Sequence, residues 1–334
     1  MRQRGKNTMN RYLNVNRIEF AVTYLCNGKC KHCYTTMDKE MFPNHIDEFI
    51  AQEIVRKVGK KHHPRSIMTF GGEPLLFPEI VFKIHKEAMK VGILHREVIT
   101  NGYWSNNDKK IEEIAKGLFN SGVNNVIISV DVFHQEHIPL KYVRKAAQSC
   151  LKAGIKDIEW NPCWVIAENE NNRYNKKTKK ILQSLEDLSI KISYGNVMEP
   201  DGFALLNLKE FLPKKEKIPI GKCGDIPYTD PLDSIQSIFI EPDGKIAVCN
   251  DFYIGNARKM DVLKIIEEYD PYKNIEMKSI IENGMIGLAE WARKKGIDPD
   301  PNGYYSICHM CTDIRKKVKN NNKDPVGVFR KKSS

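Results

Sequence analysis

The stretch CNGKCKHCY, residues 26–34, carries three cysteines in the spacing C-x3-C-x2-C. It follows an apolar segment, Ile18–Leu25, that is typical of a β-strand, so the cysteines lie in a loop at the carboxyl end of that strand. Parallel α/β folds place their sites at this end. Because a structural zinc site uses four protein ligands, three local cysteines favour a metal with an open coordination position; zinc with a distant fourth ligand is the alternative.

Downstream of this loop, apolar segments of strand length alternate with segments of helix length. Such βα repetition predicts a parallel sheet covered by helices. The predicted strands are Ile18–Leu25, Ser66–Phe70, His95–Thr100, Asn125–Asp131, Lys156–Ala167 and Ile190–Val197. The predicted helices are Ile46–Lys60, Pro78–Val91, Asp108–Ser121, Leu140–Ala153 and Lys176–Leu188.

The pattern changes after residue 205. The segment SIQSIFIEPDGKIAVC predicts a β-hairpin that turns at Pro242-Asp243-Gly244, and helices follow it. A loop is expected to carry CHMC, residues 308–311. We therefore expect an α/β domain followed by a small α+β domain. The expected boundaries are 1–16 for an N-terminal extension, 17–210 for the α/β domain, 211–318 for the second domain and 319–334 for a basic tail.

Composition narrows the class of protein. Nine cysteines, an odd number, without an apolar signal segment indicate a reducing, cytoplasmic setting in which clustered cysteines bind metal. No apolar run is long enough to span a membrane. The net charge of +11 is compatible with an anionic partner, but the basic residues are scattered, so nucleic acid is not the expected partner.

A second motif, TFGGEPLL at residues 69–76, follows the second predicted strand. Its paired glycines allow backbone to approach a ligand closely, and Glu73 offers a carboxylate to a cation. A simple strand-to-helix turn with two glycines is the alternative interpretation.

With both motifs in this order, the chain resembles the radical S-adenosylmethionine superfamily. The resemblance implies a partial (βα)6 TIM-like barrel and a [4Fe-4S] cluster on Cys26, Cys30 and Cys33. It also implies that S-adenosylmethionine binds the open iron, is cleaved by one electron from a reductant such as flavodoxin or ferredoxin, and yields a radical that takes a hydrogen atom from the substrate.

The same resemblance implies a set of residues around S-adenosylmethionine. Ser129 and Asp131 are expected to face the same way by strand alternation, although Asp131 capping the following turn is the alternative. The loop NVMEPDGFA, residues 196–204, is expected beside the adenosine. The implied cofactor-binding residues are Tyr34, Gly71, Gly72, Glu73, Asn101, Ser129 and Asp131.

The C-terminal cysteines are similar to the twitch domain, a short relative of the SPASM domain. In that pattern Cys223, Cys249, Cys308 and Cys311 would hold one auxiliary [4Fe-4S] cluster, with zinc as the alternative. The long spacer between Cys223 and Gly244 leaves open that Cys223 is instead a free thiol that returns a hydrogen atom.

Two further positions could border a substrate cavity. In DIEWNPCWVIA, Cys163 shares the more polar strand face with Glu159 and Asn161, so it is either a hydrogen-atom donor or a buried thiol that fills space. His134 is expected to form a polar wall of the cavity. A zinc site at His134 and His137 is not expected, because the sequence offers no other ligands nearby.

We thus expect a radical S-adenosylmethionine enzyme that modifies a ribosomally made peptide by epimerisation or by cross-link or thioether formation. The alternative is the same machinery acting on a small molecule, as a dehydrogenase or in cofactor assembly. A third hypothesis is a non-enzymatic zinc-binding module that holds nucleic acid through its basic surface. The GGE motif and the βα units argue against it.

Overall fold

The computed structural model describes residues 10–34, 43–249 and 252–320, which form two compact units. Within the described residues, the barrel unit comprises 18–215 with 240–244, and the C-terminal unit comprises 10–17, 216–239 and 245–320. Residues 1–9 of the expected N-terminal extension and 321–334 of the expected basic tail lie outside the described residues.

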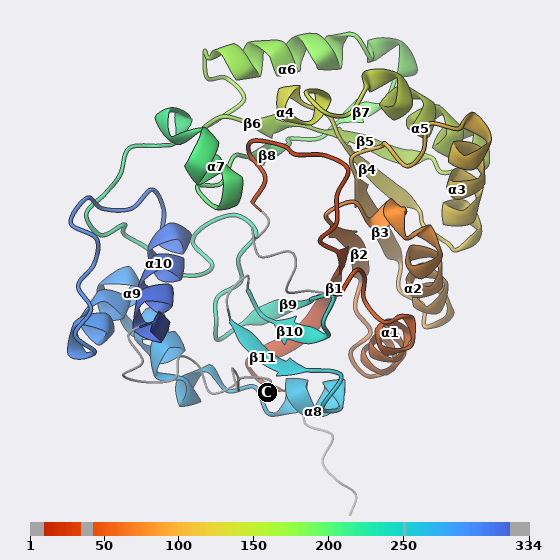
Figure 1. Ribbon diagram of the computed structural model, residues 1–334. Helices are drawn as coiled ribbons and strands as arrows, with labels where there is room; N and C mark the ends of the chain where they lie inside the picture. The colour runs from red at the N-terminus through yellow and green to blue at the C-terminus, as the bar shows by residue number, and fades with distance from the viewer. Residues whose placement is uncertain (1–9, 35–42, 250–251, 321–334) are drawn as a thin grey trace, which may run out of the picture. The chain divides into compact units, whose positions relative to one another are not determined.

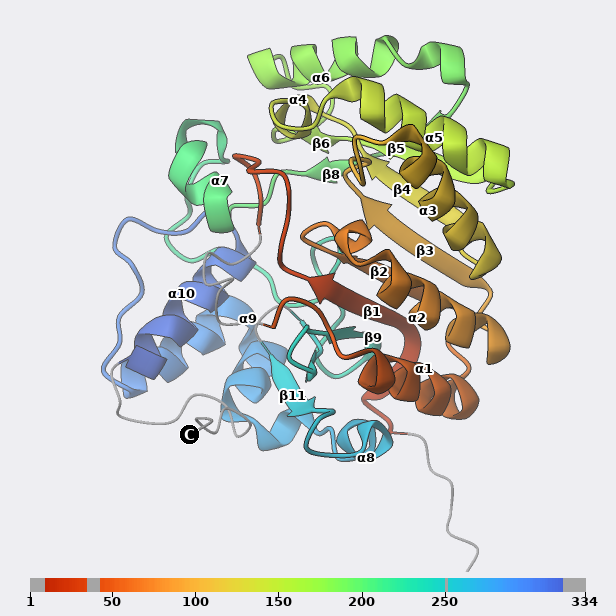
Figure 2. The ribbon, with the colours of Figure 1, turned by 45° about the vertical axis from the view of Figure 1, so that its right-hand side comes forward.

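The barrel unit is built on a sheet in which each strand lies beside the strand that precedes it, in the order β1-β2-β3-β4-β5-β7 (Figures 1 and 2). The pairs from β2 to β7 are parallel. The strands are β1 (Leu13–Thr23), β2 (Ser66–Gly71), β3 (His95–Thr100), β4 (Asn125–Ser129), β5 (Asp157–Asn161) and β7 (Lys191–Ile192). This winding confirms the α/β fold of a partial TIM-like barrel.

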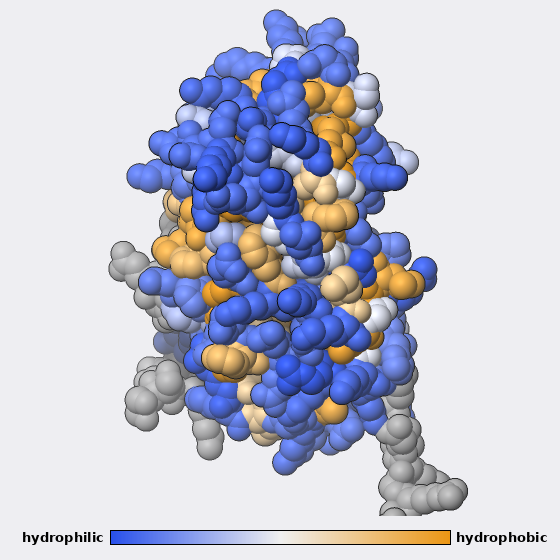
Figure 3. All heavy atoms as spheres, turned by 90° about the vertical axis from the view of Figure 1, so that its right-hand side faces the viewer, coloured by the Kyte–Doolittle hydropathy of each residue, from blue (hydrophilic) through white to orange (hydrophobic). Residues whose placement is uncertain are grey.

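Helices cover the outer face of the sheet, as Figure 1 shows. Asp47 and Asn107 begin the first and third long helices by accepting hydrogen bonds from backbone N–H groups. The outer face seen in Figure 3 is mostly hydrophilic, because the apolar sides of these helices are buried. None of the described helices is long and apolar enough to cross a bilayer. The helices are α1 (Glu48–His62), α2 (Pro78–Lys90), α3 (Asp108–Asn120), α4 (Val132–Gln135), α5 (Leu140–Ala153), α6 (Arg173–Gln183) and α7 (Gly202–Asn207).

Two of the predicted strands, Lys156–Ala167 and Ile190–Val197, were wrong because each is broken into two shorter strands. Pro162 separates β5 from β6 (Cys163–Trp164), since proline has no N–H for the ladder. Gly195, with a φ of +73°, precedes β8 (Asn196–Val197) and separates it from β7. The fragments β6 and β8 pair with each other in a two-stranded sheet of their own. The alternation argument for the face of Cys163 therefore has no basis past Pro162.

The ends of two other strands also differ from the predictions. Strand β1 begins at Leu13 rather than at Ile18. Strand β4 ends at Ser129, so strand alternation does not extend to Asp131, and the prediction that these two side chains face the same way has no basis.

The C-terminal unit contains the predicted hairpin, formed by β9 (Ile235–Ile240) and β10 (Lys245–Ala247), and β11 (Tyr253–Asn256) pairs antiparallel with β10. Its helices are α8 (Val262–Glu267), α9 (Ile275–Lys294) and α10 (Ile307–Asn320). The CHMC segment was wrongly predicted as a loop, because Cys308 and Cys311 lie in the first two turns of α10.

Helices α9 and α10 are joined by a buried ion pair. Arg315 Nε donates to Glu276 Oε2 at 2.8 Å, and both side chains are almost fully buried. The Arg315 guanidinium also lies 3.7 Å above the centre of the Phe252 ring. Losing either charge would leave the other buried and unpaired, so this pair fixes how α10 packs in the C-terminal unit.

Candidate active site

The three-cysteine loop follows β1 directly and is folded tightly. Gly28 N–H donates to Cys26 Sγ at 3.3 Å, and Cys33 N–H donates to the Cys30 carbonyl at 3.2 Å. A Cβ on Gly28 would lie 3.4 Å from Cys30 Sγ and 3.7 Å from Cys26 Sγ. These two sulfur atoms therefore border the same small space, which a side chain at residue 28 would fill.

The GGE motif holds this loop through backbone contacts. Gly72 N–H donates to the Thr23 carbonyl at 2.7 Å, and Glu73 N–H donates to the Leu25 carbonyl at 2.8 Å. A Cβ on Gly72 would collide with the Leu25 carbonyl oxygen, and one on Gly71 with the Thr23 carbonyl oxygen. The glycines thus let the motif approach the segment that leads into Cys26, whereas the sequence suggested an approach to a ligand.

The Glu73 carboxylate joins the ends of two parallel strands. Its Oε1 accepts from Thr100 Oγ1 at 2.8 Å and from Leu75 N at 3.0 Å, and its Oε2 accepts from Asn101 N at 2.7 Å. The side chain is fully buried. Burial raises the pKa of Glu73 to about 7, against the opposing effect of these donors. The sequence suggested that this carboxylate binds a cation; in this structure its partners are hydrogen-bond donors of the chain itself.

Asn101 extends this network to the first cysteine. Its Nδ2 donates to Asn27 Oδ1 at 2.7 Å and lies 3.8 Å from Cys26 Sγ, while its Oδ1 accepts from Tyr103 N at 2.8 Å. One chain of hydrogen bonds therefore connects Glu73, Asn101 and Cys26.

Asp131 caps the short helix α4, as the alternative interpretation held. Its Oδ1 accepts from Phe133 N and His134 N, both at 2.9 Å. Its Oδ2 accepts from His134 Nδ1 at 2.8 Å and from Cys163 N at 3.1 Å. Burial alone would raise the pKa of Asp131, but His134 and His32 hold it at about 2. The carboxylate is therefore ionised and fixes both His134 and the start of β6.

Two histidines lie beside Cys30. Among the described residues, Cys30, His32 and His134 form the one group whose three ligand atoms all lie within 4.8 Å of one another. The expectation that no further metal ligand lies near His134 was therefore wrong. Nothing in the spacing of the sequence joins His32 to His134; only the fold brings α4 to the cysteine loop.

Cys163 is buried at the same place. Burial raises the pKa of its thiol, and the nearby Asp131, Glu199 and Cys30 raise it further. Its burial is what a space-filling thiol requires, and the role of hydrogen-atom donor stays a prediction. Ser129 is buried at the carboxyl end of β4, opposite Asn161 of β5.

The segment 196–204 was wrongly predicted as a loop, because it begins in β8 and ends in α7. The start of α7 contacts the end of the cysteine stretch. Phe203 N–H donates to the Cys33 carbonyl at 2.8 Å. Gly202 has a φ of +50°, and a Cβ on it would meet the Cys33 and Tyr34 backbone. The Tyr34 side chain is 45% exposed. The segment that the sequence placed beside an adenosine thus contacts the residues after the third cysteine.

These residues fit a four-iron cluster better than a single ion. Cys26, Cys30 and Cys33 do not form a group with ligand atoms within 4.8 Å, as one metal ion would need. A cluster bound through one thiolate per iron holds its sulfur ligands farther apart, with one iron left open.

In the C-terminal unit, the turn that carries Cys223 packs against a kink in α9, because Met285 N–H donates to the Gly221 carbonyl at 3.1 Å. Burial raises the pKa of the Cys223 thiol to about 12, and the neighbouring Cys249 raises it while Arg315 lowers it. Cys308 and Cys311 are three residues apart in α10 and share one side of that helix.

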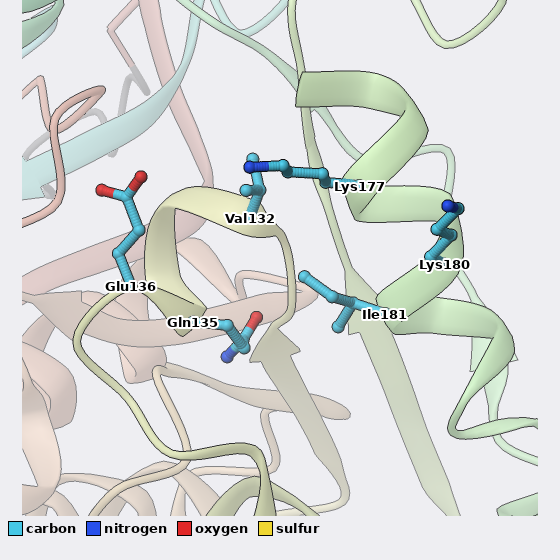
Figure 4. Close-up of a pocket in the computed structure, with 6 residues that line it drawn as sticks. All are labelled: Val132, Gln135, Glu136, Lys177, Lys180 and Ile181. Atoms are coloured by element: carbon cyan, nitrogen blue, oxygen red, sulfur yellow. The ribbon is translucent and has the colours of Figure 1, made fainter. Parts of the chain in front are cut away.

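A hollow of about 330 Å³ lies between α4 and α6 (Figure 4). It is lined by Val132, Gln135, Glu136, Lys177, Lys180 and Ile181. Gln135 also accepts a hydrogen bond from Asp131 N at 2.8 Å, so the hollow lies behind the residue that fixes His134.

Comparison with known proteins agrees with this arrangement. The fold is similar to that of the solved enzyme anSMEcpe with bound AdoMet, at a TM-score of 0.52 and 16% identity over 92% of this chain and all of that one. Residues 20–173 match the family model of the radical SAM superfamily. This stretch of the chain is therefore a radical SAM domain.

Among relatives, the GTP 3',8-cyclase of Helicobacter pylori J99 is 25% identical over 87% of this chain and 97% of that protein. The putative peptide biosynthesis protein YydG of Bacillus subtilis 168 is 26% identical, over 41% of this chain and 42% of its own length.

The close approach of Gly72 to Leu25 predicts that Gly72→Ala displaces the cysteine loop. We expect a loss of about 1–3 kcal/mol of stability from overpacking and a lower iron content after anaerobic reconstitution. Leu76→Ala, at an exposed position of the same turn, is the matched control and should behave as the wild type. Unchanged iron content and stability in Gly72→Ala would contradict the structural role of the motif.

The raised pKa of Glu73 predicts a pH dependence of stability in the metal-free protein. Between about 4.5 and about 7 the folded form keeps a proton that the unfolded form has lost, so stability falls as pH rises through this window. Urea unfolding at pH 5 and pH 8 should show a larger loss in the wild type than in Glu73→Gln. Glu79→Gln, on the exposed face of α2, should lose as much stability between pH 5 and pH 8 as the wild type. An equal loss in all three proteins would refute the raised pKa of Glu73.

Proposed function

We propose that this radical SAM enzyme acts on a small molecule, as an enzyme of cofactor assembly, and that an anionic nucleotide is its substrate class. The observation that carries the radical chemistry is the three-cysteine loop, locked by the GGE backbone at the carboxyl end of the parallel strands. Support for a nucleotide comes from the likeness to GTP 3',8-cyclase, which runs along nearly the whole length of both chains. The net charge of +11 suits a polyanionic substrate.

In this proposal Cys26, Cys30 and Cys33 hold a [4Fe-4S] cluster. When bound, the cluster supplies an open iron for S-adenosylmethionine and the electron that cleaves it to the 5′-deoxyadenosyl radical. The network of Glu73, Asn101 and Asn27 orients Cys26.

The other predicted cofactor-binding residues stay proposals. They are Tyr34, Gly71, Gly72, Ser129 and Asp131, of which Asp131 acts through His134 and Gly72 through the Leu25 backbone. Buried side chains around them keep water from the reacting centre.

We further propose that Cys223, Cys249, Cys308 and Cys311 hold an auxiliary [4Fe-4S] cluster. The effect of Cys249 and Arg315 on the Cys223 pKa is consistent with α10 and the segment just after β10 bringing their cysteines toward Cys223.

Iron analysis tests this pair of clusters. Each cluster holds four irons, so we expect about eight irons per reconstituted chain and about four after Cys26→Ala/Cys30→Ala/Cys33→Ala. Cys223→Ala added to that triple variant should remove the remaining iron. If the combined variant keeps about four irons, Cys223 is a free thiol rather than a ligand. Zinc in place of the second four irons would refute an auxiliary cluster.

Formation of 5′-deoxyadenosine tests the substrate class. We expect the reduced enzyme to form it several-fold faster with GTP than with S-adenosylmethionine alone, and to incorporate deuterium into it from deuterated GTP. Cys30→Ala should form none. Stimulation by peptides but not by any nucleoside triphosphate would refute the small-molecule proposal while leaving the radical chemistry intact.

A peptide substrate is the second candidate, and one observation favours it. Cys163 is a buried thiol near Cys30, where it could return a hydrogen atom to a substrate radical in an epimerisation. Peptide-related matches exist in YydG and in anSMEcpe, which was solved with AdoMet and the Cp18Cys peptide. The fold likeness extends over 92% of the chain, but the likeness to YydG covers less than half of either protein.

A further inference from the structure

We propose that, while the chain holds no iron–sulfur cluster, Cys30, His32 and His134 bind one divalent cation of the zinc class. This site shares Cys30 with the cluster and is otherwise separate from it. Neither histidine is among the cluster ligands proposed above, and the site does not depend on the substrate assignment.

The distances among the three residues suit a single ion. Each offers one ligand atom, and the three atoms lie within 4.8 Å of one another. One thiolate with two imidazoles is a donor set that zinc, cobalt and nickel accept readily. Three protein ligands leave the fourth tetrahedral position to water.

His134 is already oriented for binding. Its Nδ1 faces Asp131 Oδ2 at 2.8 Å, which leaves the opposite ring nitrogen, Nε2, for a cation. A carboxylate behind a ligating histidine is the usual second support of a metal site. Asp131 is itself fixed by Phe133 N and Cys163 N, so the ring is held before any ion arrives.

His32 carries an unsatisfied buried atom. Its Nδ1 is buried and has no hydrogen-bond partner. The ring stacks on Phe133, with centres 4.8 Å apart, and meets the edge of His134 at 4.9 Å. These contacts keep the ring from turning toward solvent, and native proteins rarely leave such a nitrogen without a partner.

Because both use Cys30, the single cation and the iron–sulfur cluster cannot be bound at the same time. A cation on Cys30 Sγ would occupy one of the three thiolates that a cluster needs, so cluster insertion has to displace it. The site would protect the Cys30 thiol before the cluster is assembled, and excess zinc would slow assembly.

Cobalt titration of the metal-free, full-length chain under anaerobic conditions tests the site. We expect a thiolate-to-cobalt charge-transfer band and visible bands of four-coordinate cobalt. The wild type should bind about one cobalt ion more than His32→Asn/His134→Asn or Cys30→Ala, and this extra ion is the increment. Asp131→Asn should bind this ion about 10–100-fold more weakly. Zinc should abolish the bands.

The controls separate this site from other thiols. His137→Asn, an exposed position just after α4, and Cys26→Ser/Cys33→Ser should keep the increment. The double histidine variant should still take up cluster iron at the wild-type level, which also shows that it folds. The proposal would be overturned if the double histidine variant still bound the extra cobalt ion, or if Cys26→Ser/Cys33→Ser lost it. The lack of any thiolate-to-cobalt band in the wild type would also overturn it.

Discussion

The rest of the barrel site depends on two backbone hydrogen bonds, from Gly72 N–H to Thr23 and from Glu73 N–H to Leu25. They fasten the end of β2 to the segment that leads into Cys26, and only glycine at residue 72 permits the approach. The Glu73 side chain then reaches the end of β3 through Thr100 and Asn101. Three consecutive parts of the chain are thus held as one rigid support for the cysteine loop.

A second support begins at Asp131. It is ionised although buried, because three backbone N–H groups and the His134 ring contact its two oxygens. Through Cys163 N it also holds β6, and through His134 it holds an imidazole beside Cys30. Glu73 and Asp131 are both fully buried carboxyl groups, and burial raises the pKa of each. At Glu73 burial outweighs the hydrogen-bond donors, whereas at Asp131 His134 and His32 together outweigh burial, so the two pKa values move in opposite directions.

The sequence predicted those features that local chemistry determines. Helix α5 has the predicted ends, because its last turn meets Gly154 in the left-handed conformation. The radical SAM motifs were recognisable because three thiolates and a glycine pair are rare combinations. The broken strand at Pro162 had a readable signal, since proline rarely continues a strand. The meeting of His32 with His134, and the partners of Glu73, had none, because they arise from tertiary packing between segments far apart in the chain.

The central claim is that the three-cysteine loop holds a four-iron cluster whose open iron binds S-adenosylmethionine. The most direct test is electron paramagnetic resonance of the reduced protein carrying Cys223→Ala, Cys249→Ala, Cys308→Ala and Cys311→Ala, with and without S-adenosylmethionine. We predict the signal of one reduced [4Fe-4S] cluster whose g values change when S-adenosylmethionine is added. A signal that S-adenosylmethionine leaves unchanged, or no cluster signal at all, would contradict the account.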